Sequence, residues 1–316
     1  MRWIDGHCDV LWRMWEDPTK DFYQEDGRLD VTYTSLIQAK VRLQVFAIFV
    51  PPFIQRGQRC REAFKQVDLF YRRIIRDGEK MVLLTSINEL DQLSPKQCAA
   101  LLSLEGAEAL EGDLTLLHIF YRLGVRQLGL TWNVANEAAD GILEERGGGL
   151  TQFGRKLLAE MERLQMIVDV SHLSEKAFWE TIERVDLPVI ASHSNCRAVC
   201  SHKRNLTDEQ IQAIIKREGL IGINFVPYFV KEQAPTIADL FRHLDHIVSM
   251  GGEEVIFFGS DFDGELKKIP SLEHMGKLNN FKKELVKRYS EHTVQKWGFE
   301  NAYRFYSKHL NRKDLG

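Results

Sequence analysis

Eight short runs of apolar and β-branched residues recur along the chain, with amphipathic segments between them. Runs that are nearly continuous in apolar residues are typical of parallel strands covered on both faces. Eight such strands alternating with helices over 316 residues predict a (β/α)8 TIM barrel, with a doubly wound sheet as the alternative. A further run, "MVLLTS" from residue 81, could form an extra strand. The eight expected strands cover residues 3–5, 43–50, 100–104, 127–132, 167–171, 189–192, 220–225 and 255–259.

Two of the intervening segments carry clear helix signals. The segment "TQFGRKLLAEMERLQ" begins with Thr151, whose hydroxyl can cap a helix, and continues with apolar residues at helical spacing. The segment "TDEQIQAIIKREG" is opened by Thr207 and closed by Gly219. No internal repeat, low-complexity tract or linker divides the chain. We therefore expect one catalytic barrel domain over residues 1–316.

The composition argues against several classes of protein. The formal net charge is −3 and no long block of one sign occurs, so we expect no nucleic-acid partner. The longest apolar run, "LQVFAIFVPPFI", is too short to cross a bilayer and contains two prolines. Without a signal-peptide pattern at the start, these features predict a soluble cytoplasmic protein with no membrane partner. The five cysteines form an odd, loosely spaced set, which predicts reduced thiols rather than disulfides.

Histidines and carboxylates follow five of the expected strands, just past their C-terminal ends. They are His7 and Asp9 after the first strand, Glu105 after the third, His172 after the fifth, His193 after the sixth and Asp261 after the eighth. In a barrel these strand ends converge on one rim, so residues far apart in sequence become neighbours. Side chains two residues apart at a strand end point the same way, so His7 and Asp9 can reach one ion. Imidazole and carboxylate ligands suit zinc or a similar transition metal.

Each of these residues also has a structural interpretation. A single strand-end histidine is more often a hydrogen-bonded structural residue than a ligand. Asp9 and Asp261 could cap following helices, and Glu105 beside Gly106 could be a turn residue. The stretch "DFDG" is too short for a calcium loop. Because the structural interpretation would have to hold independently at five strand ends, we favour a metal site.

Blocks of sequence spread along the chain resemble the membrane dipeptidase family, also called renal dipeptidases. The resemblance runs in order from residue 4 to about residue 310. It implies a (β/α)8 metal-dependent hydrolase with two zinc ions, which cleaves dipeptides by attack of a hydroxide that bridges the metals. The blocks are "DGHCDVL", "SLEGAEAL", "GLTQFGRKLLAEMERLQMIVDVSHLSEKAF", "PVIASHSNCRAVCSHKRNLTDEQI", "IGINF", "HLDHI" and "GSDFDG".

The resemblance also implies a role for each site residue. His7 and Asp9 would hold one zinc, His172 and His193 the other, and Glu105 would bridge them. Asp261 would be the catalytic carboxylate that takes a proton from the attacking water and passes it to the departing amine. Arg204, in "SHKRNLTD", would grip the substrate's C-terminal carboxylate through its bidentate guanidinium. From the residues alone, Arg204 could equally be a surface residue beside a helix cap.

One stretch departs from the family pattern. Animal members carry a substrate-binding histidine after the fourth strand, where this chain has Trp132 in "GLTWNVANEAADG". Trp132 can donate an indole N–H but cannot carry charge, so it could be a substrate contact or a packing residue of the barrel mouth. Asn133 or Asn136 could supply an oxyanion donor instead. The loop 136–150 is long enough for a lid, and Tyr228 is a further candidate substrate contact.

Other functions remain as alternatives at this stage. A related barrel metallohydrolase could act on lactones, cyclic amides or β-lactams, although those enzymes typically begin with His-x-His. A non-catalytic metal-binding scaffold would usually have lost one or more ligands, whereas all six rim residues are present. The oligomeric state is open, and a homodimer is one expectation because such barrels often pair. The sequence does not decide whether the substrate's second residue is L or D.

Overall fold

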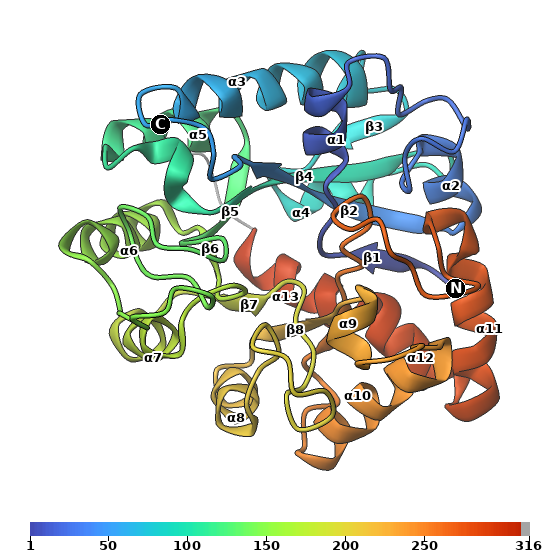
Figure 1. Cartoon of the computed structure of the whole chain (residues 1–316). Coiled ribbons are helices and arrows are strands. Elements are labelled where there is room, and N and C mark those ends of the chain that lie inside the picture. The colour runs from blue at the N-terminus through green and yellow to red at the C-terminus, as the bar shows by residue number, and fades with distance from the viewer. Residues whose placement is uncertain (311–316) are drawn as a thin grey trace.

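The strands of the computed structural model, which describes residues 1–310, form a closed parallel barrel (Figure 1). The strand order is β2-β1-β9-β8-β7-β6-β5-β4, and pairing of β2 with β4 closes the ring. β3 pairs with the start of β4 and lies outside the ring. The strands are β1 (Trp3–Asp5), β2 (Val41–Phe49), β3 (Met81–Leu83), β4 (Cys98–Glu105), β5 (Val125–Gly129), β6 (Ile167–Asp169), β7 (Val189–Ala191), β8 (Leu220–Ile223) and β9 (Ile256–Phe258).

The structure confirms the predicted TIM barrel, and the doubly wound alternative is wrong. All eight expected runs contain barrel strands, and "MVLLTS" contains the extra strand β3. Several strands end before the predicted boundary. β6 stops at Asp169 and β9 at Phe258.

Helices surround the barrel, and turns of other helix types extend them (Figure 1). The α-helices are α1 (Val10–Glu16), α2 (Tyr33–Gln38), α3 (Arg59–Leu69), α4 (Ile87–Asp91), α5 (Leu114–Arg122), α6 (Gln152–Leu164), α7 (Glu175–Arg184), α8 (Asp208–Lys216), α9 (Pro227–Val230), α10 (Ile237–Ser249), α11 (Leu278–Arg288), α12 (Glu291–Gln295) and α13 (Asn301–His309). The shorter 3-10 and π turns are η1 (Phe70–Ile75), η2 (Ala107–Leu110), η3 (Met275–Lys277) and η4 (Lys296–Glu300). Among residues 1–310, no helix is both long and apolar enough to cross a bilayer.

The two helices singled out in the sequence begin where their capping residues predict. Thr151 accepts a hydrogen bond from the Gly154 amide at the start of α6, and Thr207 forms a capping box with Gln210 at the start of α8. α8 ends at Lys216, slightly earlier than expected, and Glu218 rather than Gly219 takes the left-handed conformation, with φ 50°. The five cysteines are free thiols, as predicted.

Two hydrophobic cores hold the barrel together. One lies between strands and outer helices, and the other fills the barrel interior with side chains such as Ile4, Leu43 and Phe257. Residues of α13, including Phe305 and Tyr306, belong to this inner core and close the end of the barrel opposite the site. A Cβ on Gly222 or Gly259 would lie 1.9 or 1.8 Å from the Ser192 carbonyl oxygen, so only glycine permits this close approach of the backbone at the ends of β7, β8 and β9. The sealed interior leaves the rim as the open end.

Candidate metal centre

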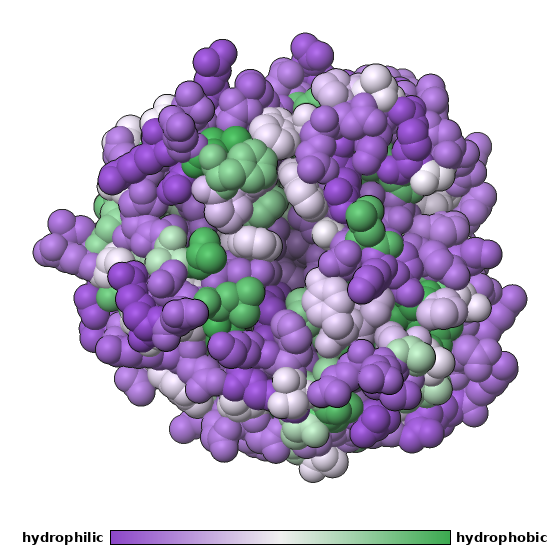
Figure 2. Space-filling view, in the orientation of Figure 1, coloured by the Kyte–Doolittle hydropathy of each residue, from purple (hydrophilic) through white to green (hydrophobic). Residues whose placement is uncertain are grey.

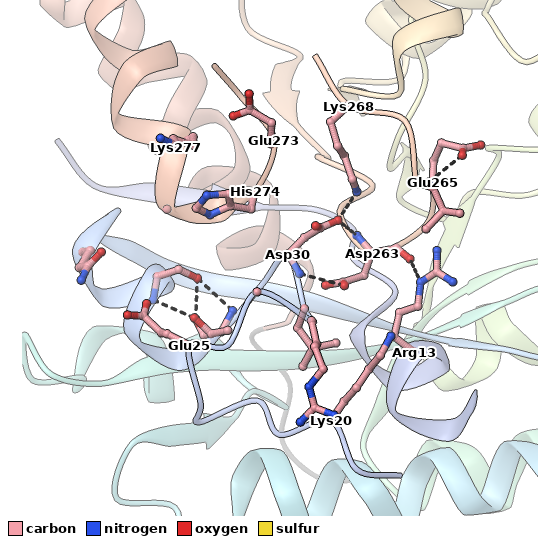
Figure 3. Close-up of a pocket in the computed structure, with 18 residues that line it drawn as sticks. Arg13, Lys20, Glu25, Asp30, Asp263, Glu265, Lys268, Glu273, His274 and Lys277 are labelled. Atoms are coloured by element: carbon pink, nitrogen blue, oxygen red, sulfur yellow. Dashed lines mark hydrogen bonds and ion pairs between the residues drawn. The ribbon is translucent and has the colours of Figure 1, made fainter. Parts of the chain in front are cut away.

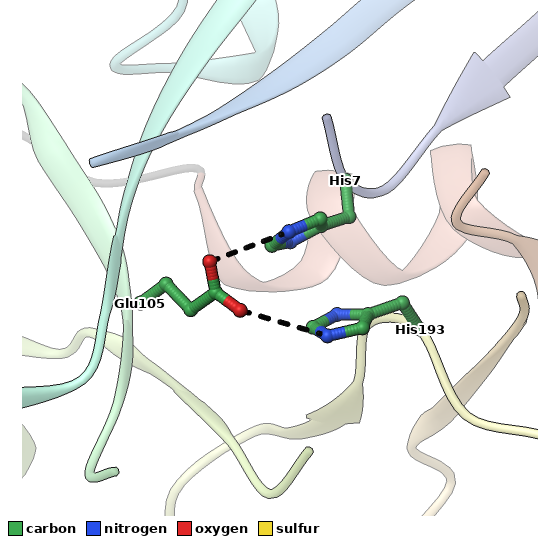
Figure 4. A group of neighbouring side chains, drawn as sticks. All are labelled: His7, Glu105 and His193. Carbon is green, nitrogen blue, oxygen red and sulfur yellow. Dashed lines mark ion pairs between the residues drawn. The ribbon is translucent and has the colours of Figure 1, made fainter. Parts of the chain in front are cut away.

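The predicted ligands lie together at the C-terminal rim. His7 lies two residues past β1, Glu105 ends β4, and His193 lies two residues past β7 (Figure 4). His172 and Asp261 follow β6 and β9, both with left-handed backbone, at φ 70° and φ 60°. Such a conformation is uncommon for a residue other than glycine and needs support from its surroundings.

Buried carboxylates at the strand ends supply that support. Asp5 accepts hydrogen bonds from the Ser260 amide and hydroxyl, both at 2.7 Å, and from Gln44 Nε2 at 2.9 Å. Asp169 accepts the amides of Ser171 and Ser192, both at 3.0 Å. Burial raises the pKa of Asp5 to about 6, despite these donors. These supporting residues were missed in the sequence, although an aspartate shortly before each of two rim histidines was the visible signal.

Glu105 lies between two groups of ligands. Its Oε2 is 3.6 Å from His7 Nε2, while its Oε1 is 3.0 Å from His172 Nε2 and 3.8 Å from His193 Nε2. His7 Nε2 is also 3.4 Å from Asp9 Oδ2 and 4.0 Å from Asp261 Oδ1. The donor atoms of His7, Glu105 and His193 lie within 4.8 Å of one another, as do those of His7, Asp9 and Asp261. The carboxylate thus faces both halves of one compact cluster.

The two histidines beside Glu105 present lone pairs to each other. His172 Nδ1 donates to Asn133 Oδ1 at 2.8 Å, which leaves Nε2 unprotonated. Ser192 Oγ donates to Asp169, so it accepts from His193 Nδ1 at 2.7 Å, and His193 Nε2 is unprotonated as well. Burial is the largest cause that lowers the pKa of both imidazoles well below the usual value. A neutral imidazole with an unprotonated Nε2 is the form in which histidine binds a metal ion.

The half of the cluster that contains His7, Asp9 and Asp261 carries excess negative charge. Burial alone would lower the pKa of His7, but the carboxylates of Glu105 and Asp9 outweigh it and raise the pKa to about 10. Neither ring nitrogen of His7 has a hydrogen-bond partner, although both are buried. A buried polar atom without a partner is costly, and a bound cation would satisfy it. The residues present therefore fit a transition-metal ion.

Two structural interpretations of these residues are wrong. Asp9 occupies the N-cap position of α1, but its side chain makes no capping hydrogen bond. No described helix begins directly after Asp261, whose Oδ2 instead accepts a hydrogen bond from Asn224 Nδ2 at 2.8 Å. Burial is the main cause that raises the pKa of Asp261 to about 6, so this carboxyl can exchange a proton near neutral pH. Asn224, which orients Asp261, was not found from the sequence.

Arg204 is a buried part of the centre and not a surface residue. Only 4% of the residue is exposed. Its Nη2 donates to the His193 carbonyl oxygen at 3.2 Å and lies 3.1 Å from His172 Nε2, while its Nε has no partner. A charged guanidinium with an unused buried donor, held beside the ligands, can receive an anionic group.

A cavity of about 310 Å³ opens onto the ligands. Asp9, Glu105, His172 and Asp261 contribute to its lining, as do Trp132, Asn133 and Tyr228. The Trp132 ring also packs on Phe49, with centroids 5.2 Å apart, so it is a packing residue of the barrel mouth that lines the cavity, and its contact with substrate stays a prediction. The Tyr228 hydroxyl donates to Glu265 at 2.8 Å.

The loop after β5 is tied to the site by its backbone. Asn136 is not an available oxyanion donor, because its Nδ2 donates to the Leu130 carbonyl and its Oδ1 accepts the amides of Ala138 and Ala139. The amide of Ile142 donates to the carbonyl of the predicted ligand His172 at 2.7 Å. The long loop thus supports the centre directly.

A larger cavity of about 740 Å³ lies next to the loop after β9 (Figure 3). Its wall contains Asp263, which accepts the amides of Asp30 and Val31 at 2.9 and 3.1 Å. Arg13 Nε donates to the Asp263 carbonyl oxygen at 2.6 Å. The second aspartate of "DFDG" therefore fastens the loop that carries Asp261, and does not belong to the ligand cluster.

Fold and site together define a class: a TIM barrel with imidazoles and carboxylates gathered at its C-terminal rim is a metal-dependent hydrolase. The model of the membrane dipeptidase family, peptidase family M19, matches residues 1–314. The chain belongs to the membrane dipeptidase family, and it is a dipeptide hydrolase of the metallopeptidase type.

Individual relatives agree with this assignment. The dipeptidase aclJ of Aspergillus oryzae is 30% identical over 313 residues, covering 90% of this chain and 72% of the relative. The chain is 31% identical to dipeptidase 3 of Rattus norvegicus, with 90% of this chain and 60% of that protein covered. The solved structure of dipeptidase AC, an M19 metallopeptidase, superposes with a TM-score of 0.91 at 28% identity and 99% coverage of both chains. The structure of a Rhodobacter sphaeroides metallopeptidase bound to a phosphinate mimic of L-Ala-D-Ala superposes with a TM-score of 0.90 at 27% identity, covering 98% of this chain and 99% of that one.

Proposed function

We propose that the protein is a binuclear zinc dipeptidase that hydrolyses dipeptides with a free C-terminal carboxylate, of L,D as well as L,L configuration. The observation that carries the proposal is the position of Glu105, whose two carboxylate oxygens face different histidines. One zinc ion would be held by His7 and Asp9 and the other by His172 and His193, with Glu105 between them. Zinc bound there supplies Lewis-acid polarisation of the scissile carbonyl and lowers the pKa of a water nucleophile.

The chain's own residues do the remaining work. Asp261 takes the proton of the attacking water on its carboxylate and returns it to the departing amine, a role supported by its raised pKa and its place in the cavity wall. Asn224 fixes the orientation of that carboxylate by donating to Oδ2. Asn133 holds the His172 ring in the tautomer that leaves Nε2 free.

Recognition of the substrate's carboxylate is assigned to Arg204. Its Nε is buried without a partner, and its Nη2 lies 3.1 Å from His172 Nε2, so a carboxylate reaching the guanidinium would gain a charge-assisted hydrogen bond. Dipeptides ending in a carboxamide would lack the charge. The acceptance of a D residue at the second position is supported by the similar Rhodobacter sphaeroides enzyme, which was solved with a mimic of L-Ala-D-Ala.

The test is amine release from L,L and L,D dipeptides by the zinc-loaded protein, with C-terminally amidated copies alongside. Cleavage of the free acids and not of the amides is the expected result. Cleavage of both series alike would contradict carboxylate recognition, and cleavage of L,L substrates alone would contradict the wider stereochemistry. Metal analysis of the same sample should give two zinc ions per chain.

A further inference from the structure

Large apolar side chains are exposed on the loops that follow the barrel strands, and two of them, Phe53 and Tyr228, line the 310 Å³ cavity. Among the described residues, Phe53 and Leu266 are the most exposed large hydrophobic side chains, at 76% and 82%. Phe53 lies on the loop after β2 and Leu266 on the loop after β9, while Leu143 and Tyr228, also exposed, follow β5 and β8. Figure 2 shows hydrophobic groups in green on several sides of the central hollow. Exposed apolar groups gathered at a cavity mark a binding surface.

Inside the mouth, one wall of the 310 Å³ cavity is aromatic. Trp12 and Phe49 meet edge to face with centroids 5.5 Å apart, and Phe49 meets Trp132 at 5.2 Å. Pro51, Pro52 and Phe53 continue this wall outward to the solvent. Trp12 Nε1 is buried and has no hydrogen-bond partner. The wall thus offers a continuous apolar surface with one unused donor.

The barrel order places this wall opposite the proposed carboxylate site. Trp12 follows β1, Phe49 ends β2 and Trp132 follows β5, and these strands lie on one side of the ring. Arg204 follows β7 and Tyr228 follows β8, on the other side. The ligand cluster lies between the two sides. A dipeptide whose carboxylate reaches Arg204 and whose amide carbonyl lies at the ligands must direct its N-terminal residue toward the aromatic wall.

We propose that the enzyme selects dipeptides whose N-terminal residue has a bulky apolar or aromatic side chain, which packs on Trp12, Phe49 and Phe53. The inference rests on the proposed function, because that function sets the direction of the substrate. Burial of such a side chain against aromatic rings is favourable, whereas glycine or alanine leaves the wall in contact with water. The carboxylates of Asp261 and Glu265, which hold no zinc in the proposed function, also line the cavity, so an acidic N-terminal side chain is disfavoured.

The experiment compares kcat/KM of the zinc-loaded full chain for Phe-Gly, Leu-Gly, Ala-Gly and Glu-Gly with the reversed peptides Gly-Phe, Gly-Leu and Gly-Ala. We expect kcat/KM for Phe-Gly and Leu-Gly to exceed that for Ala-Gly by about 10-fold, the effect of burying roughly half of a large apolar side chain. Glu-Gly should have the lowest kcat/KM. Equal values for Phe-Gly and Ala-Gly overturn the inference. A greater effect of size at the second residue than at the first also overturns it.

A variant of Phe53 tests whether the aromatic wall causes the preference for a bulky N-terminal side chain. Phe53→Ala should lower the ratio of kcat/KM for Phe-Gly over Ala-Gly by about 3- to 10-fold, as expected for one aromatic contact. Because Phe53 is 76% exposed, the variant should fold normally. Val286→Ala, an exposed apolar residue of α11 that does not line the cavity, is the matched control and should leave the ratio unchanged. An unchanged ratio in Phe53→Ala contradicts the assignment.

Calorimetric titration with the same peptides separates this inference from the proposed function. If no dipeptide is cleaved, hydrolysis is refuted, yet tighter binding of Phe-Gly than of Gly-Phe or Ala-Gly would still support the aromatic wall as the site for the first side chain. Equal or absent binding of all of them would overturn the inference too.

Discussion

The Nε2 atoms of His172 and His193 lie 2.7 Å apart, and the other ring nitrogen of each is engaged as a donor, to Asn133 and to Ser192. Two lone pairs at this distance repel one another, and in this structure the cation beside them is the Arg204 guanidinium, whose Nη2 lies 3.1 Å from His172 Nε2. The Glu105 carboxylate, 3.0 Å from His172, adds negative charge at the same point. The surrounding hydrogen bonds thus hold both imidazoles in the metal-binding tautomer before any ion arrives.

Replacing Glu105 by Gln should separate the two halves of the centre. A neutral amide offers one oxygen, so it cannot face His7 and His172 with two anionic ligand atoms. We expect metal content to fall to one ion per chain or fewer and dipeptide hydrolysis to be lost. Metal analysis and amine release measure both effects, and Glu145→Gln, an exposed residue of the loop after β5, is the control. A fully active Glu105→Gln enzyme would rule out the bridging role.

Asp261→Asn tests proton transfer. The amide is similar in size, but it cannot accept the proton of the attacking water. kcat should fall by about 10²- to 10⁴-fold, with a much smaller change in KM. Metal analysis of the variant should still give two ions per chain. If metal is lost along with activity, Asp261 acts as a ligand and the catalytic assignment is wrong.

Arg204→Met tests recognition of the substrate's carboxylate. Methionine keeps much of the apolar volume but removes the charge and the donors. KM for free-acid dipeptides should rise by about 10- to 100-fold, the loss of one charge-assisted hydrogen bond. The preference for free acids over amidated copies should shrink by a similar factor. A preference that persists in Arg204→Met would show that another group binds the carboxylate.

His243 should make the fold sensitive to acid. It accepts the Cys196 amide at 3.1 Å through Nδ1 and donates to the Val230 carbonyl at 3.0 Å, so it is neutral in the fold. Burial, the main cause, lowers its pKa to about 4 from 6.5. The lowered folded-state pKa means that this contribution to stability is complete above about pH 6.5 and is lost as pH falls toward 4, with on the order of 2 kcal/mol lost by pH 5.

Urea unfolding of the metal-free protein at pH 7 and pH 5 measures that loss. His243→Asn removes the titrating group and keeps an acceptor for Cys196, so its free energy of unfolding should change less between the two pH values. His172 and His193 titrate in the unchanged protein and in His243→Asn alike, so they do not contribute to the difference in pH dependence between the two proteins. An identical pH dependence in the variant would contradict the assignment.

The sequence by itself determined the strands, the barrel and the chemical nature of the site. Apolar runs such as that of β2 and capping residues such as Thr151 act locally, so they can be identified without knowing the fold. The position of His7, Glu105 and Asp261 at or just after strand ends placed them on one rim once a barrel was inferred. The family resemblance supplied their expected roles.

Only the tertiary structure decided how these residues meet. The sequence gives no distance between Glu105 and the histidines of β6 and β7, because that distance depends on closure of the barrel between β2 and β4. The sequence did not decide whether Arg204 lies on the surface or in the site. Its burial beside His193 in the structure decides this question. The tautomers of both histidines also depend on tertiary contacts. His172 bonds to Asn133 of another loop, and the Ser192 hydroxyl beside His193 is oriented by Asp169. Hydrophobic patterns and caps are local, whereas ligand geometry depends on side chains brought together from strands far apart in sequence.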